Sequence, residues 1–145
     1  MAEPVYFLDV NVPMYAAGKA HPYKESCTWI LRAITEGRLD TAIDVEIIQA
    51  VLYRYGAIQR PEIGVQMANS LLRLIPNVLP ITPAVVVRAI HLFADYGPQG
   101  VKVRDVIHVA VMESHDLTHI ISTDKHFDPI EGIVRIDPQI LFAQR

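Results

Sequence analysis

The hydrophobic positions of this chain change their period several times between its two ends. Short apolar runs of β type alternate with longer segments in which apolar residues recur every three or four positions. The predicted strands are residues 5–9, 41–43, 78–81, 119–122 and 133–136. The predicted helices are residues 23–36, 45–58, 62–74, 83–95 and 102–115, with a short helix after Pro138. This alternation predicts an α/β fold with parallel strands, because a parallel connection needs a crossover that is usually helical.

Capping and breaking residues mark the ends of several predicted helices. Asp44 and Thr82 each stand before an apolar helical segment, where a side-chain oxygen can accept from the first turn. Pro61 and Pro83 stand at the start of a helix, where the missing N–H costs no hydrogen bond. A Gly-Pro pair ends the helical pattern that follows Pro83 and opens a loop at 97–101.

Length and composition indicate one domain, spanning residues 1–145. The chain is 51% hydrophobic and 20% charged, which is typical of a globular domain with a sizeable core. Its single cysteine, Cys27, excludes an internal disulfide and favours a reducing compartment and a buried thiol. No secretion signal stands at the N-terminus, and no apolar run approaches the ~18 residues of a membrane span. We therefore expect a cytoplasmic protein without a membrane partner.

The formal net charge of −3 is not that of a general nucleic-acid binder. Non-specific affinity for nucleic acids rests mainly on Lys and Arg that neutralise phosphates. A nucleic-acid role must therefore be local. Carboxylates gathered around a bound cation would make the net charge a poor guide, because the cation reverses the local field.

Three aspartates stand where apolar runs stop. Asp9 closes the first predicted strand and Asp124 follows the fourth, so both fall at the strand ends where open parallel sheets bind ligands. Asp105 begins a helix that is apolar nearly all round, which is the pattern of a buried helix. Burying several carboxylates costs too much for a small domain unless a cation or partner offsets their charge. The three aspartates therefore point to a shared metal site.

Structural roles compete with metal binding for each of these acids. Asp9 also suits a turn, since Asp side chains often cap turns and helix starts. Asp105 also suits a pairing with Arg104, or the first turn of its helix, where the dipole favours a negative charge. Asp124 and Asp128 both suit capping of the turn that follows the fourth strand. The six histidines show no zinc-binding spacing and are interpreted as scattered packing or surface residues.

The segments that carry the acids resemble those of the PIN-domain ribonucleases. YFLDVNVPMYA resembles the opening of that family, with Asp9 and Asn11 in the places of its first Asp and a neighbouring Asn. VRDVIHVAV resembles its central Arg-Asp helix, and IISTDKHFDPIEGIVRI its closing strand, acidic loop and last strand. The three segments occur in the expected order and span nearly the whole chain.

This resemblance implies a PIN-like three-layer α/β fold, with a sheet of about five parallel strands flanked by helices. It also implies a Mg²⁺- or Mn²⁺-dependent endoribonuclease with Asp9, Asp105 and Asp124 as catalytic metal ligands, and Asp128 as a weaker candidate. Small single-domain members are mostly the toxin half of type II toxin–antitoxin pairs, often called VapC toxins. The implied substrate is RNA, and the implied partners are a cognate antitoxin and a second copy of the chain.

Four further residues are candidates for supporting roles at such a site. Asn11 and Thr123 would orient metal ligands or water, and Arg104 would contact a phosphate. Glu46 is an acid near the expected place of another ligand, but its position in the first turn of a helix also suits the helix dipole.

The chain departs from the family pattern at Ala50. In PIN-domain ribonucleases a catalytic Glu follows about six residues after the cap of the helix that succeeds the second strand. Counting from Asp44, that place falls on Ala50, and Glu46 lies one helical turn earlier on the same face. A metal ligand tolerates a displacement of only ~0.2 Å, so Glu46 could replace the missing Glu only with a shifted backbone. We therefore expect impaired activity, through either an inactivating substitution or a naturally weakened member.

Other functions compete with an impaired nuclease. The chain could serve as a catalytically inactive module that binds RNA or an antitoxin, with the helices around Trp29, Tyr53 and Leu72 offering an apolar groove. A phospho-accepting receiver-like domain has a similar length, but the acidic pair that it needs near the first strand is absent. The opening also faintly resembles the DxDxV motif of haloacid-dehalogenase phosphatases, with Asn11 in place of the second Asp.

Overall fold

The computed structural model describes residues 4–145 and contains one five-stranded parallel sheet. The strand order is β3-β2-β1-β4-β5, and every neighbouring pair is parallel. The predicted α/β class and strand number are therefore confirmed. A receiver-like domain would have the order 2-1-3-4-5, so that alternative is wrong. The strands are β1 Tyr6–Leu8, β2 Thr41–Asp44, β3 Val78–Leu79, β4 His119–Ile121 and β5 Val134–Ile136.

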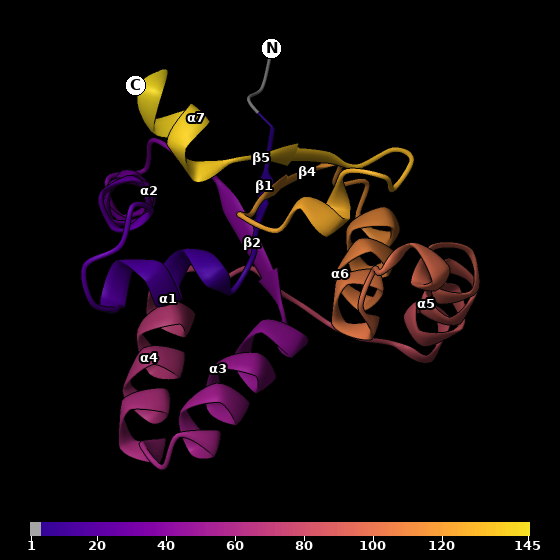
Figure 1. Ribbon diagram of the computed structural model, residues 1–145, viewed down its shortest axis with the longest axis horizontal. Coiled ribbons are helices and arrows are strands. Elements are labelled where there is room, and N and C mark those ends of the chain that lie inside the picture. The colour runs from indigo at the N-terminus through magenta and orange to yellow at the C-terminus, as the bar shows by residue number, and fades with distance from the viewer. Residues whose placement is uncertain (1–3) are drawn as a thin grey trace.

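The helices connect these strands and cover the sheet (Figure 1). Each of the predicted helices is present within one or two residues of its expected ends. No helix within residues 4–145 combines the length and the apolar character needed to cross a bilayer. The helices are α1 Asn11–Ala17, α2 Lys24–Thr35, α3 Val45–Ala57, α4 Pro61–Leu74, α5 Pro83–Tyr96, α6 Val103–Ser114 and α7 Pro138–Ala143, with 3₁₀ turns at Gly97–Gln99 and Lys125–Phe127.

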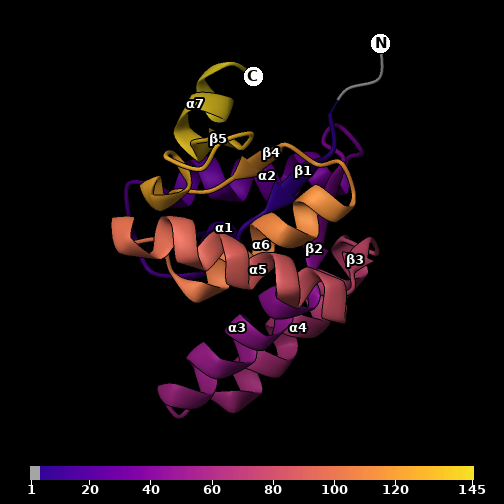
Figure 2. The ribbon, with the colours of Figure 1, turned by 90° about the vertical axis from the view of Figure 1, so that its right-hand side faces the viewer.

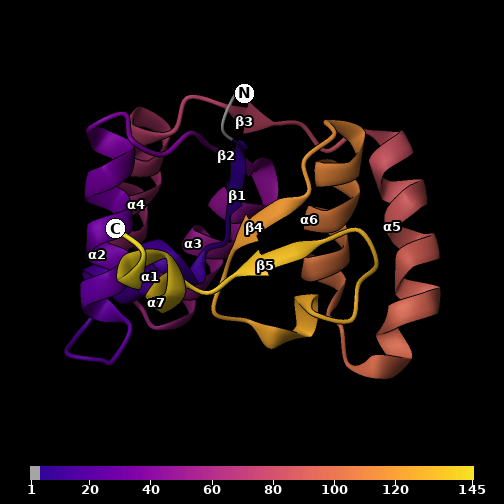
Figure 3. The same ribbon diagram turned by 90° about the horizontal axis from the view of Figure 1, so that it is seen from above.

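Helices lie on both sides of the sheet and at one of its ends. Figure 3 shows α2 and α7 on one side and α5 and α6 on the other. Helices α3 and α4 form a hairpin that projects from the body of the molecule, as both Figure 1 and Figure 2 show. Helix α3 begins directly after β2, so its first turn lies at the carboxyl edge of the sheet.

The register of the central strands brings distant parts of the chain to that edge. Tyr6 of β1 pairs with Thr41 of β2 and with His119 of β4, and all three strands run in the same direction. The residues that follow β1, β2 and β4 therefore emerge side by side. Helix α6 is buried over most of its surface, as its nearly continuous apolar pattern predicts.

Two predicted helix caps are confirmed by their hydrogen bonds. The Asp44 carboxylate accepts from the backbone N–H of Ile47 over 3.0 Å, and the Thr82 hydroxyl accepts from that of Val85 over 3.2 Å. Each cap satisfies a donor that the first turn would otherwise leave without a partner. The cap at Asp44 fixes where α3 starts at the carboxyl edge of the sheet.

Two local features differ from the sequence-based expectation. Helix α1 was not predicted, because it is only seven residues long, contains Pro13 and has no side-chain cap. The loop expected at 97–101 contains a 3₁₀ turn, which ends at Gly100 with a φ of +93°. Only a residue without a Cβ adopts such a φ readily, so Gly100 allows the chain to turn into α6.

Candidate active site

Asp9 lies at the end of β1 and is almost completely buried. Its Oδ1 accepts from the backbone N–H of Val10 over 2.8 Å. Its Oδ2 accepts from the Ser122 hydroxyl over 2.6 Å and from the Asn11 side-chain amide over 3.1 Å. These donors come from the ends of the adjacent strands β1 and β4 and hold the carboxylate in one orientation.

Asn11 and Ser122 connect Asp9 to the loop after β4. The Asn11 side chain also donates to the Ser122 hydroxyl over 3.2 Å and accepts from the backbone N–H of Thr123 over 3.3 Å. The Ser122 hydroxyl accepts from the backbone N–H of Asp124 over 3.0 Å. The two sequence positions predicted to meet at one edge of the sheet, Asp9 and Asp124, are thus joined by a continuous hydrogen-bond network.

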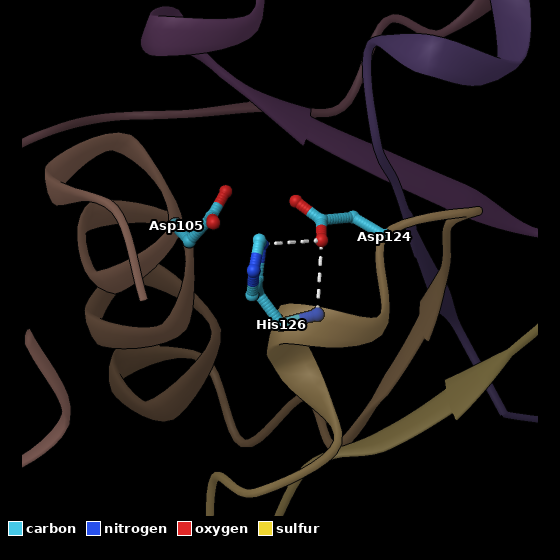
Figure 4. A group of neighbouring side chains, drawn as sticks. All are labelled: Asp105, Asp124 and His126. Carbon is cyan, nitrogen blue, oxygen red and sulfur yellow. Dashed lines mark hydrogen bonds and ion pairs between the residues drawn. The ribbon is translucent and has the colours of Figure 1, made fainter. Parts of the chain in front are cut away.

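Asp105, Asp124 and His126 form a cluster across the same edge. One ligand atom of each residue lies within 4.8 Å of the corresponding atom of the other two. Figure 4 shows the His126 ring between the two carboxylates. Asp124 Oδ1 accepts from the His126 backbone N–H over 2.9 Å and lies 3.0 Å from Nδ1 of its ring. Asp105 comes from the first turn of α6, whereas the other two residues come from the loop after β4.

The Asp105 carboxyl has an unusual environment. Its side chain is 5% exposed, and its Oδ2 is buried with no hydrogen-bond partner among the described residues. Burial, followed by the negative charges of Asp124 and Asp9, raises the pKa of Asp105 from 3.8 to about 6. A cation would be strongly stabilised here, because the buried carboxylate lies near two other carboxylates of the same charge.

A completely buried pair involves the same helix as Asp105. Nδ1 of His108, one turn after Asp105 on α6, lies 2.7 Å from Oδ2 of Asp44, and both side chains are completely buried. Burial disfavours the charged imidazole, but the hydrogen bond and charge of Asp44 outweigh that cost and raise the pKa of His108. The pair joins the start of α3 to α6 and thereby fixes the two helices relative to each other.

Ala50 lies on α3, is nearly buried and faces a pocket of about 580 Å³. Asn11 and Arg104 also line this pocket, so a longer side chain at position 50 would reach toward residues next to Asp9. Glu46 lies on the same helix but points to Arg104, whose Nε is 3.9 Å from its Oε1. Glu46 is not brought into the acidic cluster.

Two candidates, Asp128 and Thr123, make contacts that the sequence does not indicate. Asp128 forms a two-point ion pair with Arg135, at 2.7 and 3.2 Å, and this pairing lowers its pKa. It is therefore already neutralised outside the cluster. The hydroxyl that supports Asp9 belongs to Ser122, whereas Thr123 contributes its backbone N–H to Asn11.

The sequence does not indicate the roles of two histidines, His108 and His126. In the sequence His126 resembles the other scattered histidines, but it follows Asp124 by two positions, and the turn between them places its ring beside that carboxylate. His108 lies on the buried side of α6, three residues after Asp105. A polar residue within an apolar run signals a buried partner, but the sequence alone does not indicate that the partner is Asp44.

Comparison with known proteins places this arrangement in a family. A model of the PIN domain matches residues 6–133. Ribonuclease VapC13 of Mycobacterium tuberculosis is 34% identical over 129 residues, which cover 89% of this chain and 97% of that protein. Ribonuclease VapC7 of the same organism is 27% identical over 136 residues, which cover 90% of each.

Solved structures with the same fold include toxin–antitoxin proteins. VapBC2 from Rickettsia felis, crystallised with a DNA fragment from its promoter, has a TM-score of 0.71 at 15% identity, covering 91% of this chain and 97% of that one. VapC20 of Mycobacterium tuberculosis, described as a toxin that cleaves the sarcin-ricin loop, has a TM-score of 0.72 at 12% identity, covering 90% and 98%. At these identities the likeness shows the fold alone. From the family match and the relative at 34% identity, the chain belongs to the PIN-domain family, among the VapC ribonucleases.

Proposed function

We propose that this chain is the toxin of a toxin–antitoxin pair, with a divalent-metal site for RNA cleavage that is impaired at position 50. The observation that carries the proposal is the buried Oδ2 of Asp105, which has no hydrogen-bond partner among residues 4–145. It lies beside Asp124, and the charges of Asp9 and Asp124 both act on it. A bound cation would give this oxygen a partner and offset all three charges.

The donor set fits Mg²⁺ or Mn²⁺. Both are hard cations that prefer carboxylate oxygens and keep several waters, and they are usually held by a few carboxylates together with substrate phosphate oxygens. Asp105 and Asp124 would hold the ion, and His126 offers a nitrogen donor at the same place. Asp9 is outside this group of close ligand atoms, and we propose it as a further carboxylate whose charge the ion would offset. When bound, the ion would acidify a water for attack on phosphorus and neutralise charge on the phosphodiester.

The other residues would prepare the site for this chemistry. Ser122 and Asn11 hold the Asp9 carboxylate in place through Oδ2, as carboxylates that bind metals are commonly held. Asn11 also holds the backbone of Thr123 and so sets the loop that carries Asp124. Arg104 lies at the edge of the adjoining pocket with about half of its side chain exposed, where its guanidinium could bind a phosphate of the substrate.

Ala50 is the proposed cause of impaired cleavage. In the sequence resemblance it stands where PIN-domain ribonucleases carry a catalytic Glu, and it faces the pocket beside Asn11. A methyl group can neither bind a cation nor position a water. We expect this chain to bind a divalent ion less strongly than a four-acid site and to cleave RNA poorly.

A cognate antitoxin is the proposed protein partner. The support is that a toxin–antitoxin complex from Klebsiella pneumoniae has the same fold. An apolar groove of about 290 Å³ between α1, α2 and α4 could receive an antitoxin helix. Trp29, Tyr53 and Leu72 do not line this groove. A homodimer is proposed from the family resemblance alone.

The second candidate is a catalytically inactive module that binds RNA or an antitoxin. Ala50 favours this candidate, because a binding module needs the fold and a binding surface but no catalytic acid at position 50. The two candidates differ in whether Ala50→Glu brings RNA cleavage.

The metal site itself is tested by melting experiments with and without Mn²⁺ or Mg²⁺. We expect either ion to raise the melting temperature of this chain and Asp105→Asn to remove most of that rise. Asp128→Asn is the matched control, because it removes an acid that lies close in sequence but is paired with Arg135. A rise that survives in Asp105→Asn, or that Asp128→Asn removes equally, would contradict the proposed site.

A further inference from the structure

We propose that the 580 Å³ pocket beside the acidic cluster is a binding site for one nucleotide of single-stranded RNA. Its base would stack against Tyr15 and Tyr53, and its phosphate would lie against Arg104 and Lys19. This inference rests on the proposed RNA-cleaving function and names the part of the substrate that the chain recognises.

The position of the pocket ties it to the cluster. Asn11 lines the pocket and donates to Oδ2 of Asp9 over 3.1 Å. Ala50, where the family carries its catalytic acid, lines it as well. A nucleotide in the pocket would therefore be within one or two nucleotides of a phosphodiester bond held at the carboxylates. The volume falls within the range of sites for small organic ligands, which is ~300–1,000 Å³.

The charge of the pocket is opposite to that of the chain. Lys19, Arg54 and Arg104 line it, and among residues 4–145 no Asp or Glu does. The whole chain carries a formal net charge of −3, so this is a local concentration of cations. Arg104 is 3.9 Å from Glu46, too far for a hydrogen bond, and its donors remain available to a phosphate.

Near-parallel aromatic rings form one wall of the pocket. The ring centroids of Tyr15 and His21 are 4.4 Å apart with an angle of 29° between the planes, and both residues line the pocket. Tyr23 supports them from the side, 5.3 Å from the Tyr15 centroid. Its backbone N–H donates to Nδ1 of His21 over 3.2 Å, and its hydroxyl donates to Asp137 over 2.8 Å. The rings are thus held in place before any ligand binds.

Tyr53 adds an aromatic side chain from α3. It is 67% exposed and lines the same pocket as Tyr15 of α1. A large aromatic residue with so much exposed surface contributes little to the core, so its placement beside three cations favours a role in binding. Aromatic faces combined with cations bind single-stranded nucleic acid, because every base offers a face for stacking and every nucleotide a phosphate. An antitoxin segment is the competing occupant.

The test is a binding measurement with a defined RNA. A fluorescein-labelled ten-nucleotide single strand would be titrated with the present chain in Mn²⁺, with its integrity checked on a gel, and binding followed by anisotropy. Tyr15→Leu and Tyr53→Leu should each weaken binding about 5- to 150-fold, the range for losing one base–aromatic stack. Phe93→Leu is the matched control, since Phe93 is an exposed aromatic residue on α5, outside the pocket. It should leave binding unchanged.

A second probe separates stacking from phosphate binding. RNA of the same length without bases should bind the present chain more weakly, and Tyr53→Leu should weaken its binding little further. Because Tyr53 is exposed, its replacement should not unfold the chain even if that of the half-buried Tyr15 does. Equal binding of both probes, or unchanged RNA affinity in both tyrosine variants, overturns the proposal. It is also overturned if the variants keep RNA affinity and lose only antitoxin binding.

Failure of the subsite and failure of the proposed nuclease give different results. If Ala50→Glu yields no cleavage while the tyrosine variants still lose RNA affinity, the nucleotide site is supported and the proposed nuclease function is contradicted. If Ala50→Glu cleaves RNA and adding Tyr53→Leu leaves kcat/KM unchanged, the nuclease function is supported and the nucleotide site is contradicted.

Discussion

Nδ1 of His108 lies 2.7 Å from Oδ2 of Asp44 in the interior, where neither side chain is exposed to solvent. Asp44 also caps α3 through its Oδ1, which accepts from the Ile47 backbone N–H. One carboxylate therefore holds the start of the helix that carries Ala50 and contacts the helix that carries Asp105. The contact sets the distance between the helix that carries Ala50 and the helix that carries Asp105.

Loss of this contact should destabilise the fold strongly. In His108→Leu the Asp44 Oδ2 would be buried without a partner, so the free energy of unfolding should fall by about 3–5 kcal/mol. Urea unfolding at neutral pH measures this. Arg88→Gln is the control, since it breaks the ion pair with Glu113 at a site where Arg88 is 48% exposed. Its cost should be below about 1 kcal/mol. Similar costs for the two variants would show that the buried pair has no special part in stability.

The contribution of Asp105 to the stability of the metal-free chain should fall as the pH rises from about 4 to about 6. Asp105 ionises in the unfolded chain near 3.8 but in the folded chain only at a pKa of about 6. Well below pH 3.8 it is protonated in both states. Between these pH values Asp105 releases its proton in the unfolded chain but keeps it in the folded chain, which favours unfolding. The free energy of unfolding therefore falls by up to about 3 kcal/mol, and the fall is complete above pH 6.

Urea unfolding in EDTA between pH 4 and 8 checks this. Asp105→Asn should be more stable than the parent chain at pH 7.5, and the difference should vanish toward pH 4. Asp128→Asn should instead be less stable than the parent chain at pH 7.5. Arg135 lowers the pKa of Asp128, so the ionised carboxylate stabilises the folded chain above that pKa. If Asp105→Asn lost stability at pH 7.5, the carboxylate would have a partner that stabilises its charge.

His126 should influence which divalent ion binds. Its Nδ1 lies 3.0 Å from Asp124 Oδ1 within the proposed site. Imidazole suits Ni²⁺ and Zn²⁺, whereas carboxylate and water suit Mg²⁺ and Mn²⁺. His126→Asn should therefore reduce the affinity for Ni²⁺ about tenfold or more and that for Mg²⁺ much less, as measured by calorimetry. His91→Asn, on the exposed surface of α5, is the control. An equal reduction for both ions would mean that His126 only supports Asp124.

Much of the fold could be predicted from the sequence because local signals agreed with each other. Asp44 and Thr82 each follow a predicted strand and precede a predicted helix, and both cap that helix in the structure. Helix α1 could not be predicted in the same way. Seven residues without a cap give little periodic signal, and the helix depends on its packing against α2.

The candidate site was predictable only in part. Asp9 and Asp124 could be placed on one edge, because parallel strands present their carboxyl ends together. The pairing of Asp128 with Arg135 and that of Asp44 with His108 could not be predicted. They depend on side-chain directions that no sequence pattern encodes. Ser122 rather than Thr123 supports Asp9, since residues next to each other at a strand end face opposite sides.

The most direct test of the account is RNA cleavage by Ala50→Glu, with Ala50→Gln as the control of equal size and no charge. Single-stranded RNA would be incubated with each variant and the parent chain in Mn²⁺, in Mg²⁺ and in EDTA. We predict that Ala50→Glu cleaves about 100-fold faster than the other two, on the scale of one positioned catalytic group, and only with a metal present. A further Asp105→Asn should abolish the gain. No gain in Ala50→Glu, or an equal gain in Ala50→Gln, would contradict a site that lacks only this acid.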